Sequence, residues 1–132
     1  MPAFVSRLDV NSDAYQKNRS EQLENIELLR QLQARAKAAS EKRRPRFEER
    51  GQLTPRDRLA RLLDVGMPFV ELFNLASYCV DDPNRETSLP GASILAGIGY
   101  ISGVRSMICV DDSGINAGAA TERGFGKLTA CI

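Results

Sequence analysis

The chain has 132 residues, of which 42% are hydrophobic, and its formal net charge is +1. This length suits one ordinary domain rather than two, and the near-neutral charge argues against a global electrostatic field for nucleic acid. No apolar run approaches the eighteen or so residues of a membrane span, so no membrane partner is expected.

The sequence contains no histidine and three widely spaced cysteines, Cys79, Cys109 and Cys131. Without histidine, a Ser-His or Cys-His dyad and the common zinc sites are excluded within this chain. The odd number of cysteines and the absence of a CxxC pair indicate plain thiols. Residues 1–7 lack the apolar core of a secretory signal, which predicts a cytoplasmic location.

The first predicted element is a long amphipathic helix that begins at Asp13, which we expect to cap it together with Gln16. Apolar residues then recur at spacings of three and four, as on one face of a helix. These residues are Leu23, Ile26, Leu29, Leu32, Ala36 and Ala39. The apolar stripe is narrow, so the helix needs a surface to lie on, either its own domain or a partner subunit.

The segment of residues 34–61 is basic, with ten basic groups against four acidic ones. Its basic residues fall between interrupted helices, with Phe47 as the one aromatic residue, so a solvated or phosphate-facing surface is favoured over a nucleic-acid arm. Pro45 disfavours helix at Arg44 and separates the long helix from a short one that ends at Gly51.

The helix-start signals after Gly51 predict a further helix. Thr54 supplies an N-cap and Pro55 occupies the first helical position, while Leu59, Leu62 and Leu63 form the buried face. Residues 69–73 then predict a short strand. Residues 81–84, Asp-Asp-Pro-Asn, predict an exposed turn, and their two aspartates are turn formers rather than ligands.

Residues 92–110 predict a buried antiparallel hairpin. From Ile94 to Tyr100 larger side chains alternate with small ones, which is the period of a strand with one very small face. Residues 102–103, Ser-Gly, form the turn, and the apolar run of residues 107–110 suits a strand covered on both faces. The glycines at 97 and 99 superficially match a dinucleotide fingerprint, but their place inside a strand favours a packing role.

After the second strand comes a loop of small residues, 111–120. Small residues let backbone N–H groups approach a ligand, so we place the candidate site here. The candidate substrate-binding residues are Asn116, Ala117, Gly118 and Ala119. The glycine either leaves room for a ligand or serves only a φ angle that the loop needs.

Residues 50–72, from Arg-Gly-Gln-Leu-Thr-Pro-Arg-Asp-Arg onward, resemble the opening signature of the carboxyltransferase β subunit of biotin-dependent acyl-CoA carboxylases. The pattern continues in register through Pro90-Gly91, the glycines of the hairpin and residues 112–118. The beginning of the first helix resembles the methylcrotonyl-CoA and geranyl-CoA branch. Asn116-Ala117 departs from the usual lysine-glycine of the family.

The resemblance implies an α/β fold, in which an N-terminal helical arm, 1–50, is followed by the start of a crotonase-like domain, 51–132. The family's subunit is about four times this length, so we expect an N-terminal fragment. The donors that form the oxyanion holes would lie beyond Ile132, and we expect no catalytic residue and no metal ligand in this chain. The fragment alone is expected to be inactive, and poorly stable or self-associating.

The function implied by the resemblance is transfer of a carboxyl group from carboxybiotin to an acyl-CoA, so the full-length protein would be an enzyme. Biotin would be carried on a separate subunit or domain. The expected partners are the acyl-CoA substrate, the biotin carboxylase and biotin carrier, and further β subunits in a homo-oligomer. The alternative is a non-catalytic interaction module that uses the helical arm and residues 34–61 to bind a partner subunit or nucleic acid.

Overall fold

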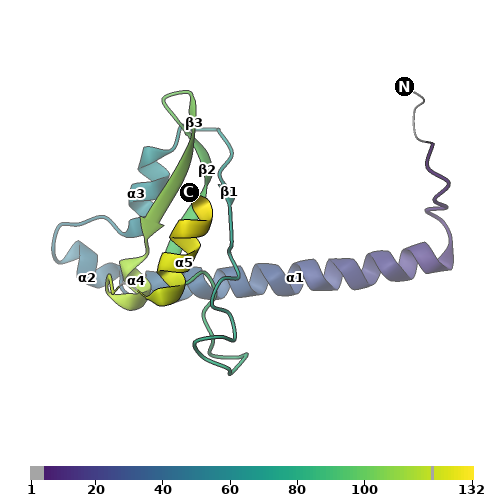
Figure 1. Cartoon of the computed structure of the whole chain (residues 1–132), viewed down its shortest axis with the longest axis horizontal. Helices are drawn as coiled ribbons and strands as arrows, with labels where there is room; N and C mark the ends of the chain where they lie inside the picture. Colours follow the sequence, from purple (N-terminus) through teal and green to yellow (C-terminus); the bar gives the residue numbers. More distant parts are fainter. Residues whose placement is uncertain (1–4, 120) are drawn as a thin grey trace. The chain divides into compact units, whose positions relative to one another are not determined.

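The computed structural model describes residues 5–119 and 121–132 (Figure 1). The chain divides into two compact units, Met1–Gln31 and Leu32–Ile132. The predicted boundary at residue 50 concerns domains of the complete protein and stays a prediction. Helices and a small sheet occur together in the second unit, which confirms the α/β class. Within the described residues, no helix combines the length and the apolarity needed to cross a membrane.

Helix α1 spans Asp13–Glu41. Its capping residue is Ser12, because the Tyr15 N–H donates to Ser12 Oγ at 3.3 Å and the Gln16 N–H donates to Ser12 O at 3.0 Å. The prediction that Asp13 is the cap is therefore wrong by one residue. From residue 32 onward, within the second unit, the helix buries Leu32, Ala36 and Ser40, which share one face at spacings of four.

Helix α2 spans Arg44–Glu48 and helix α3 spans Pro55–Leu62. The prediction that Arg44 is not helical is wrong, because a proline in the first turn of a helix removes no intrahelical hydrogen bond. The predicted break between the two helices is confirmed, but it lies between Glu41 and Arg44 rather than at Pro45. Thr54 caps α3 as predicted, since its Oγ1 accepts a hydrogen bond from the Asp57 N–H at 3.1 Å.

One antiparallel sheet runs in the order β1 (Val70–Glu71), β2 (Ile94–Ile101) and β3 (Val104–Asp111). Ile101 pairs with Val104, which confirms the hairpin and its turn at residues 102–103. Both turn residues have positive φ, as a two-residue hairpin turn requires. Their N–H groups donate to the Asp64 carboxylate at 2.7 and 2.6 Å, a contact between loop and hairpin that the sequence did not reveal.

The two glycines of β2 serve packing, as predicted. A Cβ added at Gly97 would lie 2.5 Å from the Val70 carbonyl oxygen of β1 and 2.6 Å from the Phe69 ring. A Cβ at Gly99 would collide with Leu63. Both glycines lie inside a strand rather than before a helix, so they form no dinucleotide fingerprint.

The sheet is covered on both sides, but unevenly. On one face Leu59 of α3 packs with Leu95 and Ile108 to form the apolar core. On the other face helix α5 (Glu122–Cys131), yellow in Figure 1, lies against β2. The apolar run of β3 suits cover on both faces, but within the described chain Met107 and Cys109 stay exposed.

The segment after β3 is more ordered than predicted. A short helix α4 spans Ser113–Asn116 where a loop was expected. Thr121 then caps α5, whose first turn is closed by a hydrogen bond from the Gly124 N–H to Thr121 Oγ1 at 3.0 Å. Threonine followed by glutamate is a helix-start signal, so α5 was detectable in the sequence.

The predicted turn at residues 81–84 is built by side-chain hydrogen bonds. The Asn84 N–H donates to Asp82 Oδ1 at 2.9 Å, and Thr87 Oγ1 donates to Asp82 Oδ2 at 2.6 Å. The Thr87 hydroxyl, followed by the Asn84 N–H, lowers the pKa of Asp82. Asp82 therefore acts as a turn former, as predicted.

Candidate functional site

The four predicted substrate-binding residues lie at the end of α4 and in the turn after it. Asn116 is the last residue of the helix, and Ala117 follows in the left-handed conformation with φ of 53°. Gly118 also has positive φ, 82°, and the Ala119 N–H closes the turn on Asn116 O at 2.9 Å. All four residues are exposed, so the turn presents backbone to solvent.

The φ angle at Gly118 explains part of the need for glycine there. A Cβ at this position would meet its nearest protein atom, Asp111 Oδ2, at 3.5 Å, which is an ordinary contact. The described protein atoms therefore leave space for a side chain, while the positive φ makes any substitution strained. Whether a ligand also approaches this glycine stays a prediction.

A hollow of about 240 Å³ lies beside this turn, and we call it the arginine cleft. One wall comes from the basic segment and the other from α4 and the residue that follows it. The first wall consists of Arg43, Arg46, Phe47, Arg50 and Gln52, and the second of Ser113, Ile115 and Ala117. The structure thus brings Ala117 together with residues about 70 positions earlier in the chain.

The charge of the cleft comes from Arg43, Arg46 and Arg50. All three side chains are exposed, and among the described residues none of them forms an ion pair with a carboxylate. Guanidinium groups present several N–H donors in a planar fork that matches phosphate and carboxylate oxygens. The arginine cleft is therefore suited to an anionic ligand, and which of the solvated or phosphate-facing alternatives holds for residues 34–61 stays a prediction.

Behind the cleft lies a buried polar cluster that we call the Asp112 junction, formed by Ser40, Arg56 and Asp112. Ser40 Oγ donates a hydrogen bond to Asp112 Oδ1 at 2.6 Å, and Arg56 Nη2 lies 3.2 Å from Asp112 Oδ2. The Asp112 side chain is 1% exposed and that of Arg56 is 22% exposed. Three segments far apart in the sequence therefore converge on one carboxylate.

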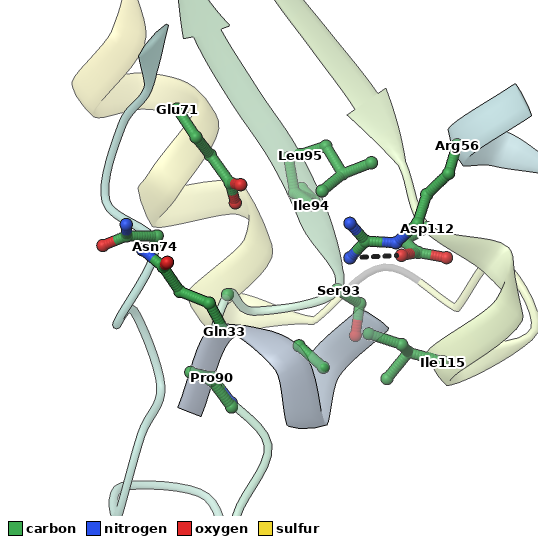
Figure 2. A pocket seen from close by; sticks show the side chains of 12 residues that line it. Gln33, Arg56, Glu71, Asn74, Pro90, Ser93, Ile94, Leu95, Asp112 and Ile115 are labelled. Carbon is green, nitrogen blue, oxygen red and sulfur yellow. Dashed lines mark ion pairs between the residues drawn. The ribbon is translucent and has the colours of Figure 1, made fainter. Parts of the chain in front are cut away.

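Part of this junction faces a small, partly open cavity of about 30 Å³ (Figure 2). Figure 2 shows the Arg56–Asp112 pair at one side of the cavity, with Glu71 and Asn74 at the other. Within the described residues, Arg56 Nε and Asp112 Oδ2 have no hydrogen-bond partner. The cavity is large enough for about one or two water molecules, so it does not accommodate an organic substrate.

A second set of charges, the Arg44 network, joins Arg44 to Glu41 and Asp57. Arg44 donates two hydrogen bonds to each carboxylate, at 2.6 and 3.1 Å to Glu41 and at 2.7 and 3.1 Å to Asp57. The Arg44 guanidinium, followed by hydrogen bonds from Thr54, lowers the pKa of Asp57 to about 2. The same guanidinium lowers the pKa of Glu41. The network links the end of α1 to α2 and α3.

Lys127 of α5 is buried and lies against the start of β2. Its Nζ donates to Ile94 O at 2.5 Å and to Gly91 O at 3.3 Å. Burial lowers the pKa of this ammonium group, and the nearby Glu71 acts in the opposite direction. Because its donors are directed to backbone carbonyls, Lys127 holds α5 against the sheet.

Sequence reasoning missed the partners of the predicted site. It treated residues 34–61 and residues 111–120 separately, and it gave no role to Ser40 or Arg56. One signal was present for Ser40, which lies four residues after Ala36 on the stripe that the sequence predicts to be buried. No local pattern indicated that Arg56 of α3 would face Asp112.

Comparisons with known proteins match this chain to one family. The model of the carboxyl transferase domain matches residues 46–131. The biotin-dependent 3-methylcrotonyl-coenzyme A carboxylase beta1 subunit of Mycobacterium tuberculosis is 40% identical over 92 residues, which are 70% of this chain and 17% of that protein. The mitochondrial methylcrotonoyl-CoA carboxylase beta chain of Arabidopsis thaliana is 34% identical over 113 residues, which are 84% and 18% of the two chains.

Solved structures of carboxylase and transcarboxylase subunits also match this chain. The beta subunit of Pseudomonas aeruginosa geranyl-CoA carboxylase superposes with a TM-score of 0.86 at 40% identity, over 98% of this chain and 24% of that one. The transcarboxylase 12S subunit, at 23% identity and a TM-score of 0.66, matches 81% of this chain and 21% of that one, and shows the fold alone. These crotonase-fold neighbours confirm the crotonase-like fold, of which this chain has a part. The chain spans about a quarter or less of the length of these relatives, and it belongs to the carboxyl transferase domain family that its sequence resembles.

Proposed function

We propose that the chain is part of the carboxyltransferase subunit of a biotin-dependent acyl-CoA carboxylase of the methylcrotonyl-CoA or geranyl-CoA type. The reaction transfers a carboxyl group from carboxybiotin to the acyl-CoA. The observation that carries this proposal is the arginine cleft, which lies beside Ala117, one of the predicted substrate-binding residues. CoA carries a pyrophosphate and a 3′-phosphate, and arginine binds phosphate with directed, charge-assisted hydrogen bonds.

In this proposal the two walls of the cleft have different roles. Arg43, Arg46 and Arg50 supply the positive charge that holds the phosphates. Ser113, on the opposite wall, offers a hydroxyl donor to the same anion. Phe47 is half-buried and adds an apolar surface on which a nucleotide base can rest. The cleft therefore positions the nucleotide end of the substrate rather than its reacting end.

The remaining chemistry belongs to other parts of the complex. Biotin, carried on a separate subunit or domain, brings the carboxyl group, and we assign no residue of this chain to it. Enolate-like charge in this reaction needs preplaced N–H donors, which we expect from other segments of the subunit. Biotin carboxylase, biotin carrier and further β subunits are the proposed partners, and the cytoplasm is the proposed location.

The proposal is tested by CoA binding to the full chain, measured by calorimetry, in wild type and in the triple variant Arg43→Gln, Arg46→Gln, Arg50→Gln. The matched control is Arg58→Gln, Arg61→Gln, Arg105→Gln, which removes three exposed arginines outside the cleft. We expect the cleft variant to weaken CoA binding by about tenfold or more, which is about 1.4 kcal/mol, and the control by less than about threefold. Equal losses in the two variants would show that only net charge matters and would refute the cleft.

A second candidate function, a non-catalytic interaction module, is favoured by apolar side chains exposed on α1. Leu23 and Ile26, which lie on the predicted apolar stripe, are each more than 40% exposed. Such a stripe can pack against a partner subunit. If the chain associates in solution, Leu23→Ser with Ile26→Ser should shift its mass toward the monomer while CoA binding is unchanged. Binding of a single-stranded RNA oligonucleotide that the cleft variant loses, without any CoA binding, would favour the nucleic-acid version instead.

A further inference from the structure

We propose that Asp112, held by Ser40 and Arg56, sets the distance between the two walls of the arginine cleft and so determines how tightly the cleft holds the phosphates of CoA. The inference rests on the proposed function, and it concerns a positioning residue, because Asp112 is buried and does not line the cleft. Four observations about the junction support it.

The first observation is where the Ser40–Asp112 hydrogen bond lies. Ser40 is three residues before Arg43, with which the basic wall begins, and Asp112 is the residue before Ser113, with which the opposite wall begins. The bond of 2.6 Å therefore connects the bases of the two walls. Both residues are almost fully buried, at 3% and 1% exposure, so solvent does not compete for the bond.

The second observation is the contact of α4 with α1. Gly114 is buried, and a Cβ added to it would lie 2.5 Å from Ser40 Oγ and 3.0 Å from Ser40 O. A real Cβ does not come this close to another heavy atom, so α4 lies directly on α1 with no room for a side chain between them. The spacing of the walls is consequently fixed by contact as well as by the hydrogen bond.

The third observation is that a third element fixes the same carboxylate. Arg56, from the first turn of α3, reaches Asp112 Oδ2 at 3.2 Å. The Asp112 N–H also donates to Ser93 O at 2.7 Å, which ties the backbone of this residue to the segment before β2. Asp112 is thus held through its side chain and its backbone, and α4 begins at the next residue.

The fourth observation is the incomplete hydrogen bonding of the pair. Within the described residues Arg56 Nε and Asp112 Oδ2 lack hydrogen-bond partners, although both atoms are buried. A buried ion pair with imperfect bonding gives little net stability compared with apolar residues of similar size. A role in fixing position accounts for charges at this place better than a role in stability does.

The test compares two buried serines. Ser40→Ala removes the hydrogen bond to Asp112. The matched control, Ser88→Ala, removes a partly buried hydrogen bond from the Cys79 N–H in a loop outside the cleft. For each variant of the full chain, calorimetry gives the dissociation constants for CoA and for dephospho-CoA, which lacks the 3′-phosphate. Urea unfolding gives the stability of each variant.

We expect Ser40→Ala to weaken CoA binding about fivefold and to reduce the preference for CoA over dephospho-CoA, because a wider cleft contacts fewer phosphate oxygens. Ser88→Ala should leave this preference unchanged even where stability falls equally. A smaller folded fraction weakens the binding of both ligands by the same factor. A change in the ratio of the two dissociation constants therefore indicates lost positioning rather than lost structure. A second variant, Gly114→Ala, should move the preference in the same direction because its Cβ displaces α4 from Ser40.

The outcomes separate this inference from the proposed function. If the wild-type chain binds neither CoA nor dephospho-CoA, the proposed function fails and this inference fails with it. If the wild type binds CoA and loses affinity in the triple arginine variant, but Ser40→Ala and Gly114→Ala keep the wild-type preference, this inference alone is refuted.

Discussion

Two arginines near the C-terminal end of α1 each pair with an aspartate, but their surroundings are opposite. Arg44 makes four charge-assisted hydrogen bonds to Glu41 and Asp57, while about a third of each side chain is exposed. Arg56 makes one contact with Asp112, whose carboxylate is fully buried. The better-bonded charges are partly exposed to water, whereas the poorly bonded carboxylate lies inside the protein.

The difference indicates that the two clusters have different structural roles. In the Arg44 network each charge keeps contact with water, so the pairs lose little hydration and contribute modestly, in a way that salt can screen. In the Asp112 junction the loss of hydration is large and only partly repaid by one ion pair and one hydrogen bond. The first cluster therefore stabilises a connection between helices, whereas the second specifies where a carboxylate and its loop lie.

The largest expected effect is that of removing one partner of the buried pair. Asp112→Ala leaves the Arg56 guanidinium without a countercharge in a mostly buried place, and we expect the free energy of unfolding to fall by about 3–5 kcal/mol. Urea unfolding of the variant and the wild type measures this change. A loss below about 1 kcal/mol would mean that solvent reaches Arg56 freely and that the comparison between the clusters is wrong.

The matching double variant, Arg56→Met with Asp112→Leu, sharpens the same comparison. It replaces both charges by apolar side chains of similar size, which is often neutral or stabilising for a buried pair. We expect most of the stability lost in Asp112→Ala to return, while the preference for CoA over dephospho-CoA stays reduced. If both the stability and the preference for CoA returned, apolar packing would position α4 as well as the charged pair does.

A smaller effect is expected for Thr54→Ala, which removes the N-cap of α3. Thr54 is 3% exposed and its Oγ1 accepts the Asp57 N–H, so the change leaves a donor of the first turn unsatisfied. The expected loss is about 1 kcal/mol of unfolding free energy. The first turn of α3 carries both Arg56 of the Asp112 junction and Asp57 of the Arg44 network. Thr54→Ala therefore disturbs the helix turn on which both clusters depend. Thr129→Ala, on the exposed part of α5, should stay within about 0.5 kcal/mol of the wild type.

Much of the fold was predictable because its signals are local. The cap at Thr54, the alternation along β2 and the turn at residues 102–103 each depend on neighbours in the chain, and the structure confirms all three. The exceptions depend on contacts between distant segments. Asp64, for example, receives both turn N–H groups from residues almost forty positions later, and no sequence pattern encodes that distance.

The candidate site was predictable only in part for the same reason. The run of small residues indicated a site at Asn116–Ala119 and the charge of residues 34–61 indicated a solvated or phosphate-facing surface, but nothing in the sequence joined them. They are brought together by Ser40 and Asp112, which are 72 positions apart. A serine on an apolar helix face is ordinary in a sequence, and its importance follows from the buried carboxylate that it meets.

The smallest expected effect concerns how the stability given by the Arg44 network depends on pH. The pKa of Asp57 is about 2 in the folded protein, below the ordinary value of 3.8, chiefly because of hydrogen bonds from Arg44 and then from Thr54. Since the folded pKa is lower than the unfolded one, the folded state favours the ionised carboxylate. The stabilisation is fully present above about pH 4 and is lost as the pH falls toward about 2.

Asp57→Asn removes this contribution at every pH, which predicts how wild type and variant compare. Their urea midpoints should differ by a constant amount above about pH 4 and converge between about pH 4 and pH 2, where the wild type becomes protonated. Glu48→Gln, a carboxylate of α2 outside the network, serves as the control for the change in net charge. Because the Arg44 network is partly exposed, 1 M salt should also narrow the difference at pH 7, through a screening length of about 3 Å. A difference that persists unchanged at pH 2 would show that Asp57 acts through packing and not through its charge, and the contrast between the two arginine clusters would then be one of burial alone.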